Sequence, residues 1–135
     1  MRYLALDLGG RRIGVAISDA LGMLARPLEV FNRASRVADY AHIGTLIAQH
    51  HVEAVIVGLP IQMDGVEGQQ AAWVRDYAQA LAETIPVPLH FWDERLTTVE
   101  AAELMHAQGK SVEKDWIDAV AAAVILRSFL DAHTN

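Results

Sequence analysis

Hydrophobic residues in the first third of the chain follow the pattern of short β-strands. The segments 2–8, 12–18 and 25–31 are apolar runs bounded by turn residues. The glycine-rich sequence GGRR joins the first two segments, which predicts a β-hairpin. The third segment would extend this hairpin into an antiparallel meander.

The hydrophobic period changes at residue 35. From Ser35 to His51 apolar residues recur at helical spacing, with Ser35 as the expected N-cap. The run 53–60 is almost wholly apolar, as in a central strand covered on both faces, and Pro60 ends it. The remaining predicted elements are a loop at 61–68, a helix at 69–83, a strand at 87–93, and helices at 97–108 and 114–132.

This order of elements predicts the fold class. A three-stranded meander followed by alternating helices and strands forms a mixed five-stranded sheet with helices packed on its faces. The expected architecture is an α/β fold of ribonuclease-H type, in a single domain over residues 1–135. A flavodoxin-like strand order is the main alternative, but it requires a helix between the first two strands, and GGRR leaves no room for one.

Composition narrows the possible chemistry. The chain has no cysteine, which excludes disulfides, thiolate zinc sites and a cysteine nucleophile. Its six histidines show no paired metal spacing, so carboxylates are the expected metal ligands. No uncharged apolar run approaches the roughly 20 residues of a membrane span, and the distance from Arg2 to Asp7 is too short for a signal-peptide core. We therefore expect a cytoplasmic protein.

The net charge bears on possible partners. A formal charge of −6 argues against a protein that coats nucleic acid through charge alone. Residues 1–36 nevertheless carry six arginines against three acidic residues. This distribution is compatible with a local contact surface for nucleic acid.

Two acidic residues stand out against apolar surroundings. Asp7 lies near the end of an apolar strand, where either a divalent cation compensates for desolvation of the carboxylate or the residue makes a turn before Gly9 and Gly10. Asp118 shares a helix face with Ala121, Ala122, Ile125 and Phe129, which places it on the buried stripe. An acid at this position is also stabilised by the N-terminal helix dipole, and Asp115, one turn earlier, is more typical of a cap.

A third acid comes from the sequence DERLTT at 93–98. Strand alternation places Asp93 and Glu94 on opposite faces, so one site at this strand end would use chiefly one of them. Thr97 and Glu100 have the spacing of a capping box for the following helix. That capping role leaves both acids unexplained, and the choice between them stays open.

Four segments in order resemble one known family over essentially the whole chain. These segments are DLGGRRIGVAISD, VGLPIQMDG, DERLTT and IDAVAAAVILRSFLD, and the family is YqgF, also called RuvX, which is related to the Holliday-junction resolvase RuvC. The resemblance implies a ribonuclease-H-like fold and a nuclease that processes the 5′ end of pre-16S rRNA or, in an older proposal, resolves four-way DNA. It also implies an acidic metal site, whose residues here would be Asp7, Glu94 (or Asp93) and Asp118.

The chain departs from the family pattern at three places along the expected substrate path. Gln62 replaces the Asn of the usual LPLNMDG loop, and Gln70 stands where a basic residue is common. Asp115 and Trp116 stand where Lys is frequent. These differences bear on nucleic-acid affinity rather than on catalysis.

The expected mechanism uses metal ions and arginines. Three carboxylates would hold two Mg²⁺ or Mn²⁺ ions about 4 Å apart, one activating water and the other stabilising the leaving oxygen. The candidate phosphate contacts are Arg11, Arg12, Arg95 and Lys114, which lie near the acids in sequence. The alternative is that these four are solvated surface charges, with one hairpin arginine paired to Asp19.

Two other functions are compatible with parts of the sequence. A phosphotransferase of the actin and sugar-kinase type also has a D-x-G hairpin, but it clasps ATP between two such domains, and this chain supplies one. A non-catalytic RNA-binding or ribosome-assembly module would require structural roles for all three acids. The expected partners are nucleic acid, with pre-rRNA ahead of branched DNA, and ribosomal precursor particles, with the chain a monomer or a homodimer.

Overall fold

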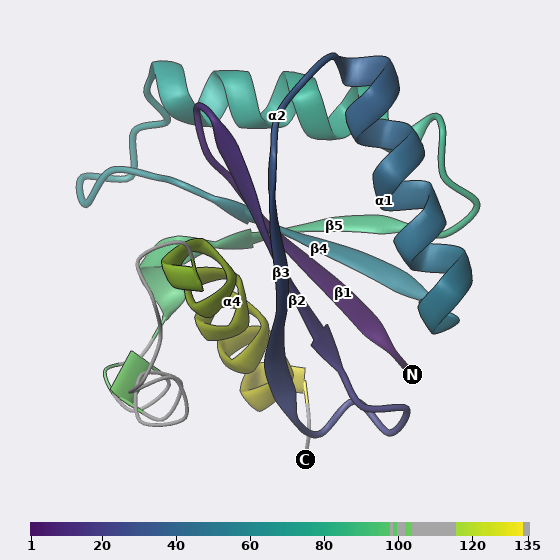
Figure 1. Cartoon of the computed structure of the whole chain (residues 1–135). Helices are drawn as coiled ribbons and strands as arrows, with labels where there is room; N and C mark the ends of the chain where they lie inside the picture. Colours follow the sequence, from purple (N-terminus) through teal and green to yellow (C-terminus); the bar gives the residue numbers. More distant parts are fainter. Residues whose placement is uncertain (98, 100–101, 104–115, 134–135) are drawn as a thin grey trace.

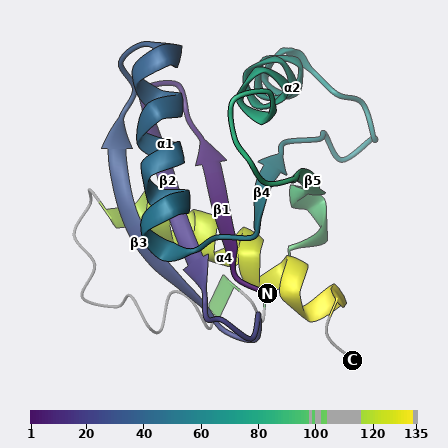
Figure 2. The same cartoon turned by 90° about the vertical axis from the view of Figure 1, so that its right-hand side faces the viewer.

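The computed structural model describes residues 1–97, 99, 102–103 and 116–133 and is built on one five-stranded sheet with the order β3-β2-β1-β4-β5. Helices α1 and α2 cover one face of this sheet and α4 covers the other (Figures 1 and 2). The strands are β1 (Tyr3–Leu8), β2 (Arg12–Ser18), β3 (Ala25–Asn32), β4 (Ala54–Leu59) and β5 (Leu89–Asp93); the helices are α1 (Arg36–His50), α2 (Gln69–Ala82), the 3₁₀ turn η1 (Glu94–Leu96) and α4 (Ile117–His133).

The strand pairing confirms the predicted mixed sheet. Strands β1, β2 and β3 pair antiparallel, whereas β4 pairs parallel to β1 and β5 pairs parallel to β4. The hairpin register places Asp7 opposite Gly14, and the parallel register places Gly58 opposite Trp92. These two glycines therefore lie at the same end of the sheet as the candidate acids.

The helix boundaries agree with the sequence pattern where the structure describes them. The hydroxyl oxygen of Ser35 accepts a hydrogen bond from the amide of Ala38 at 3.1 Å, which confirms the predicted N-cap of α1. His51 ends that helix in the left-handed conformation, with φ of 55°. The expected helix at 97–108 and the expected start of the last helix at Lys114 lie largely outside the described residues. None of the described helices is long and apolar enough to cross a membrane.

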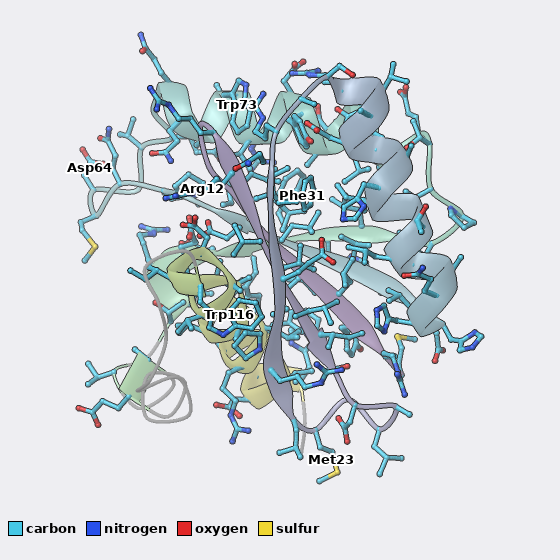
Figure 3. All side chains as sticks on the ribbon, in the orientation of Figure 1. Arg12, Met23, Phe31, Asp64, Trp73 and Trp116 are labelled. Atoms are coloured by element: carbon cyan, nitrogen blue, oxygen red, sulfur yellow. The ribbon has the colours of Figure 1, made fainter. Side chains whose placement is uncertain are left out.

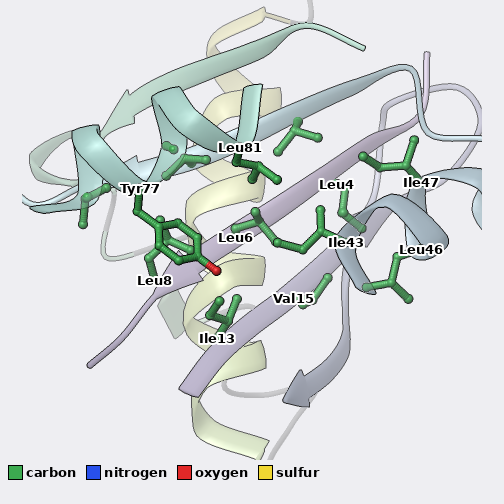
Figure 4. Packing of buried hydrophobic residues seen from close by; sticks show 14 of the residues in the cluster. Leu4, Leu6, Leu8, Ile13, Val15, Ile43, Leu46, Ile47, Tyr77 and Leu81 are labelled. Carbon is green, nitrogen blue, oxygen red and sulfur yellow. The ribbon is translucent and has the colours of Figure 1, made fainter. Parts of the chain in front are cut away.

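Strand alternation divides the core into two unequal layers. Leu4, Leu6 and Leu8 point from β1 toward α1 and α2, where they pack with large apolar side chains and with the buried Tyr77 (Figure 4). The layer against α4 is built instead from small residues of the sheet, such as Ala5 and Ala16. Small side chains let α4 approach the sheet closely, and Asp7 lies in β1 on this same face.

Candidate active site

Asp7 lies within a strand and is not a turn residue. It occupies the fifth position of β1, on the face covered by α4. Burial raises the pKa of its carboxyl to about 6, and the negative charge of Asp118 acts in the same direction. The structure therefore agrees with a desolvated carboxylate near the end of an apolar strand, and the binding of a divalent cation by this carboxylate stays a prediction.

Gly14 explains how Asp118 comes close to Asp7. Gly14 faces Asp7 across the hairpin, and a side chain at this position would overlap the carbonyl oxygen of Asp118. The first turn of α4 therefore rests directly on the backbone of β2. Asp118 is 30% exposed, and its Oδ2 lies 3.0 Å from Nε of Arg12. The predicted buried stripe is confirmed in part: Ala122, Ile125 and Phe129 are buried against the sheet, whereas Ala121 and Asp118 itself are only partly buried.

Glu94 reaches toward Asp7 across a second glycine. It begins η1, directly after β5, and its carboxyl carbon lies 3.3 Å from the point where a Cβ of Gly58 would stand. Since β4 separates β5 from β1, a side chain at Gly58 would occupy the space between the two acids. Burial raises the pKa of Glu94 to about 7, and the charges of Asp7 and then Asp93 add to the effect.

Asp93 and Glu94, between which the sequence leaves the choice of site residue open, have different surroundings in the structure. The carboxylate of Asp93 accepts a hydrogen bond from the amide of Arg95 at 2.9 Å and another from Nη2 of the same residue at 2.7 Å. These interactions lower the pKa of Asp93, with the guanidinium hydrogen bonds as the main cause. Asp93 is thus engaged locally by a positive charge, whereas Glu94 faces Asp7.

Asp7, Glu94 and Asp118 supply carboxylate oxygens, the type of ligand that a hard divalent cation prefers. Asp7 is the common neighbour, because it feels the charge of Asp118 and Glu94 feels the charge of Asp7. Buried carboxylates that repel one another are stabilised by a cation with oxygen preference. Across the part of the chain that the structure describes, however, no three or more acidic or histidine side chains are arranged so that they could hold a metal ion. Asp118 is directed instead to Arg12.

An open pocket of about 560 Å³ lies at the hairpin turn, with Asp118 in its lining. Its lining consists of Gly9, Gly10, Arg11, Arg12, Asn32 and Asp118. Both arginines are exposed, and Figure 3 shows Arg12 at the end of the hairpin. The suggested pairing of a hairpin arginine with Asp19 is wrong, because the Asp19 carboxylate accepts from the amides of Met23 and Leu24, while Arg12 pairs with Asp118.

Arg95 and Lys114 are the other two candidate phosphate contacts, and the structure describes only Arg95. Arg95 is held by Asp93, as described above, and the negative charge of Asp64 also acts on it. Asp64 makes a turn in the loop after β4, where its Oδ1 accepts a hydrogen bond from the amide of Val66 at 2.9 Å. Lys114 and Asp115 lie outside the described residues.

Gly14 and Gly58 are site residues that sequence reasoning missed. The local pattern marks Gly58 only as the end of a strand, and it does not single out Gly14. A signal is nevertheless present, because a glycine inside an apolar strand indicates close approach of another part of the chain. What the sequence lacks is the identity of the approaching group, which is the backbone of Asp118 at one glycine and the side chain of Glu94 at the other.

Solved structures with the same arrangement define the class of fold. RuvC of T. thermophilus in complex with Holliday junction substrate matches with a TM-score of 0.67 at 16% identity, covering 100% of this chain and 96% of that one. The Holliday junction resolvase of fowlpox virus matches with a TM-score of 0.58 at 9% identity, covering 98% and 99%. The fold is therefore the ribonuclease-H-like fold of these resolvases, as predicted.

Sequence comparison adds the family. The model of the RuvX family, described as Holliday junction resolvase, matches residues 1–132. A protein of Myxococcus xanthus is 44% identical over 135 residues (98% of this chain, 89% of that one), and one of Anaeromyxobacter sp. is 45% identical over 133 residues (97% of each). Both carry the name "Putative pre-16S rRNA nuclease". The chain belongs to the RuvX family, and with it to the nucleases, hydrolases that cut phosphodiester bonds.

Proposed function

We propose that this protein hydrolyses phosphodiester bonds in the precursor of 16S rRNA, with Mg²⁺ or Mn²⁺ held by Asp7, Glu94 and Asp118. The observation that carries the proposal is that the carboxyl group of Asp7 on β1 lies within electrostatic reach of Asp118 on α4 and of Glu94 in η1, and that Asp118 lines a pocket with two arginines. The names of the relatives support the choice of RNA. Such a substrate would place the protein in the cytoplasm, in contact with ribosomal precursor particles.

The acids would bind metal only after losing their protons. Asp7 and Glu94 have pKa values raised to about 6 and about 7, so protons compete with a cation for their oxygens near neutral pH. Metal affinity should therefore rise as the pH increases through this range. The bound ions would supply activated water and stabilisation of the leaving oxygen.

The arginines would bind the phosphates that flank the cleaved bond. Arg12 is already held beside the acids by its ion pair with Asp118, so it is placed to exchange that carboxylate for a phosphate. Arg11 lines the same pocket and would take a neighbouring phosphate. Arg95, which Asp93 holds directly after β5, is a further candidate, and so is Lys114, which lies outside the described residues.

Cleavage of four-way DNA is the second candidate function. It is favoured by the description of the family and by the likeness of the fold to RuvC, which was solved with junction DNA. Both functions need the same acidic site. They differ in the nucleic acid that the surrounding surface accepts.

The experiment is a cleavage assay with two substrates. The purified protein is incubated with Mg²⁺ or Mn²⁺ on a precursor-rRNA fragment and on a four-way DNA junction, beside an Asp7→Asn control. We expect cleavage of the RNA, loss of cleavage with EDTA and no cleavage by the control variant. Selective cleavage of the junction would favour the second function, and tight RNA binding without cleavage would favour a non-catalytic assembly role.

A further inference from the structure

Two carbonyl groups of the β1–β2 turn are held by one residue outside the hairpin. The backbone amide of Arg33, just after β3, donates to the carbonyl oxygen of Arg11 at 2.8 Å. The guanidinium of the same residue donates from Nη1 to the carbonyl oxygen of Gly10, also at 2.8 Å. Within the turn, Gly9 donates its amide to the carbonyl oxygen of Arg12 at 3.0 Å. Arg33 therefore supports the middle of the turn, where the chain is exposed.

Arg33 itself is held by side chains of α1 and α2, the two helices that cover the face of the sheet opposite to α4. Its guanidinium lies over the ring of Trp73 on α2, 4.4 Å from the ring centre, and 5.5 Å from that of Tyr77. Its side chain is only 24% exposed, and Nε lies 4.0 Å from Oδ2 of Asp39 on α1. Figure 3 shows Trp73 near the end of the hairpin that carries Arg12.

The partner of Arg33 on α1 is an acid fixed in the core. Asp39 is 3% exposed, and its Oδ1 accepts a hydrogen bond from the amide of Ala34 at 2.9 Å. Its Oδ2 accepts a hydrogen bond from the hydroxyl of the buried Tyr77, also at 2.9 Å. This acid cannot swing out to follow the arginine, so the position of the guanidinium is determined by the fold.

The Arg33 side chain donates a hydrogen bond to the turn but none to Asp39. Its Nε is buried and has no hydrogen-bond partner among the described residues, because 4.0 Å to Asp39 is too long for a hydrogen bond. A buried donor without a partner lowers stability. The guanidinium nevertheless keeps this orientation, in which Nη1 donates a short hydrogen bond to the carbonyl oxygen of Gly10. This orientation points to a role of Arg33 at the turn.

We propose that Arg33 is a positioning residue that fixes the Gly9–Arg12 turn and so presents Arg11 and Arg12 to the phosphates of a nucleic acid. The pocket of the proposed site is lined by this turn and by Asn32, the residue before Arg33. Arg33 thus supports the wall of the pocket from behind. That the ligand is a nucleic acid rests on the proposed function. The ordering of the turn by Arg33 is a property of the free protein and can be tested without a ligand.

Arg33→Met and Arg36→Met form a matched pair for the test. Both remove one positive charge, and Arg36 also lies near the Tyr77 ring, at 5.4 Å, but it pairs with Asp76 on α2. In the free protein, hydrogen exchange is measured at the backbone amides of Gly9 and of position 33. We expect exchange at least about tenfold faster in Arg33→Met than in the parent and close to parental rates in Arg36→Met. Equal rates in the two variants would overturn the proposal.

Binding to a precursor-rRNA fragment supplies an independent readout. Arg33→Met should weaken affinity by about 5–10-fold, but it should add little to Arg11→Ala/Arg12→Ala, because the effect acts through those side chains. Additive losses would mean that Arg33 touches phosphate itself and would also overturn the proposal. Arg33→Lys, which keeps the charge but cannot both stack on Trp73 and reach Gly10, serves in the same assays if Arg33→Met does not fold. A parent protein that binds no nucleic acid would contradict the proposed function, and the exchange rates would then decide the positioning role alone.

Discussion

At the scale of single residues, the carboxyl group of Asp7 makes stability depend on pH in an unusual direction. Its pKa in the folded protein is raised to about 6 from 3.8, so the folded state binds the proton more tightly than the unfolded chain. The unfolding free energy should therefore fall as the pH rises from about 4 to about 6. Glu94, raised from 4.5 to about 7, should extend this fall.

Asp7→Asn should remove part of this penalty. In EDTA at pH 8, we expect the variant to be more stable than the parent by about 1–3 kcal/mol, since one pKa unit corresponds to about 1.4 kcal/mol and residual hydration reduces the effect. The difference should vanish near pH 4. Urea unfolding at both pH values measures it, with the exposed Glu83→Gln as a control for the change in charge. A parent that is more stable than Asp7→Asn at pH 8 would show that Asp7 is satisfied by interactions within the fold.

Glu94→Gln and Asp93→Asn separate the two neighbouring acids. Glu94 faces Asp7, so Glu94→Gln should reduce metal-dependent cleavage by at least about 100-fold. Asp93→Asn removes a partly exposed pair with Arg95 and should cost only about 0–1 kcal/mol of stability, with cleavage within a few-fold of the parent. Rates under single-turnover conditions provide the comparison. A larger loss of cleavage in Asp93→Asn would reverse the assignment.

These two acids also show where sequence reasoning ends. Strand alternation predicts that one site would use chiefly one of them, but Glu94 lies in η1, after the end of β5, so alternation alone does not decide which. That choice depends on Gly58 leaving space on β4 and on Arg95 folding back onto Asp93, and both are tertiary effects. The partnership of Arg12 with Asp118 is equally invisible to local patterns, because it joins residues from the two ends of the chain.

At the scale of elements, the close contact between α4 and β2 is possible because Gly14 has no side chain. In Gly14→Ala, the new methyl group would overlap the carbonyl oxygen of Asp118, and α4 would have to move. We expect a loss of stability of about 3 kcal/mol, at the upper end of typical overpacking, together with loss of cleavage. Urea midpoints measure the stability change.

Gly44→Ala is the matched control for this substitution. Gly44 lies inside α1, and a side chain there would meet no atom within 4 Å. The same chemical change should therefore stabilise the protein by about 0.5–1 kcal/mol, because alanine favours the helix over glycine. Similar effects at both positions would mean that α4 does not rest on β2 as described.

The elements themselves are largely predictable, for local reasons. Alternation and apolar runs predict the five strands to within two residues, and the short GGRR connection requires the hairpin that separates this fold from a flavodoxin-like one. Ser35 identifies the start of α1 through a hydrogen bond of local origin. The roles of Gly14 and Gly58 cannot be assigned in the same way, because each depends on a segment distant in sequence.

At the scale of the whole molecule, a net charge of −6 makes nucleic-acid binding depend on local positive charge. The double variant Arg11→Ala/Arg12→Ala should weaken binding to many sequences alike and reduce the slope of log affinity against log salt by up to about two. Arg12→Ala alone also releases Asp118 from its ion pair, which would place more negative charge near the phosphate. Titrations at several salt concentrations with RNAs of unrelated sequence measure both effects.

The salt series needs two checks. A thermal melt of each variant separates a loss of phosphate contacts from a loss of folding. An unchanged slope together with unchanged affinity would remove the β1–β2 turn from the substrate path. The positive charge of residues 1–36 would then have no role in binding.

The position of α4 in the chain has a consequence for synthesis. All five strands precede α4, yet among the described elements it is α4 that covers the small-residue face of the sheet and supplies Asp118. As the chain emerges from the ribosome, this apolar face is not covered by α4, and the proposed acidic site lacks Asp118, until α4 has been made. A nascent chain would therefore be unable to cut RNA, and chains that stop before α4 should aggregate instead of acting as partial enzymes.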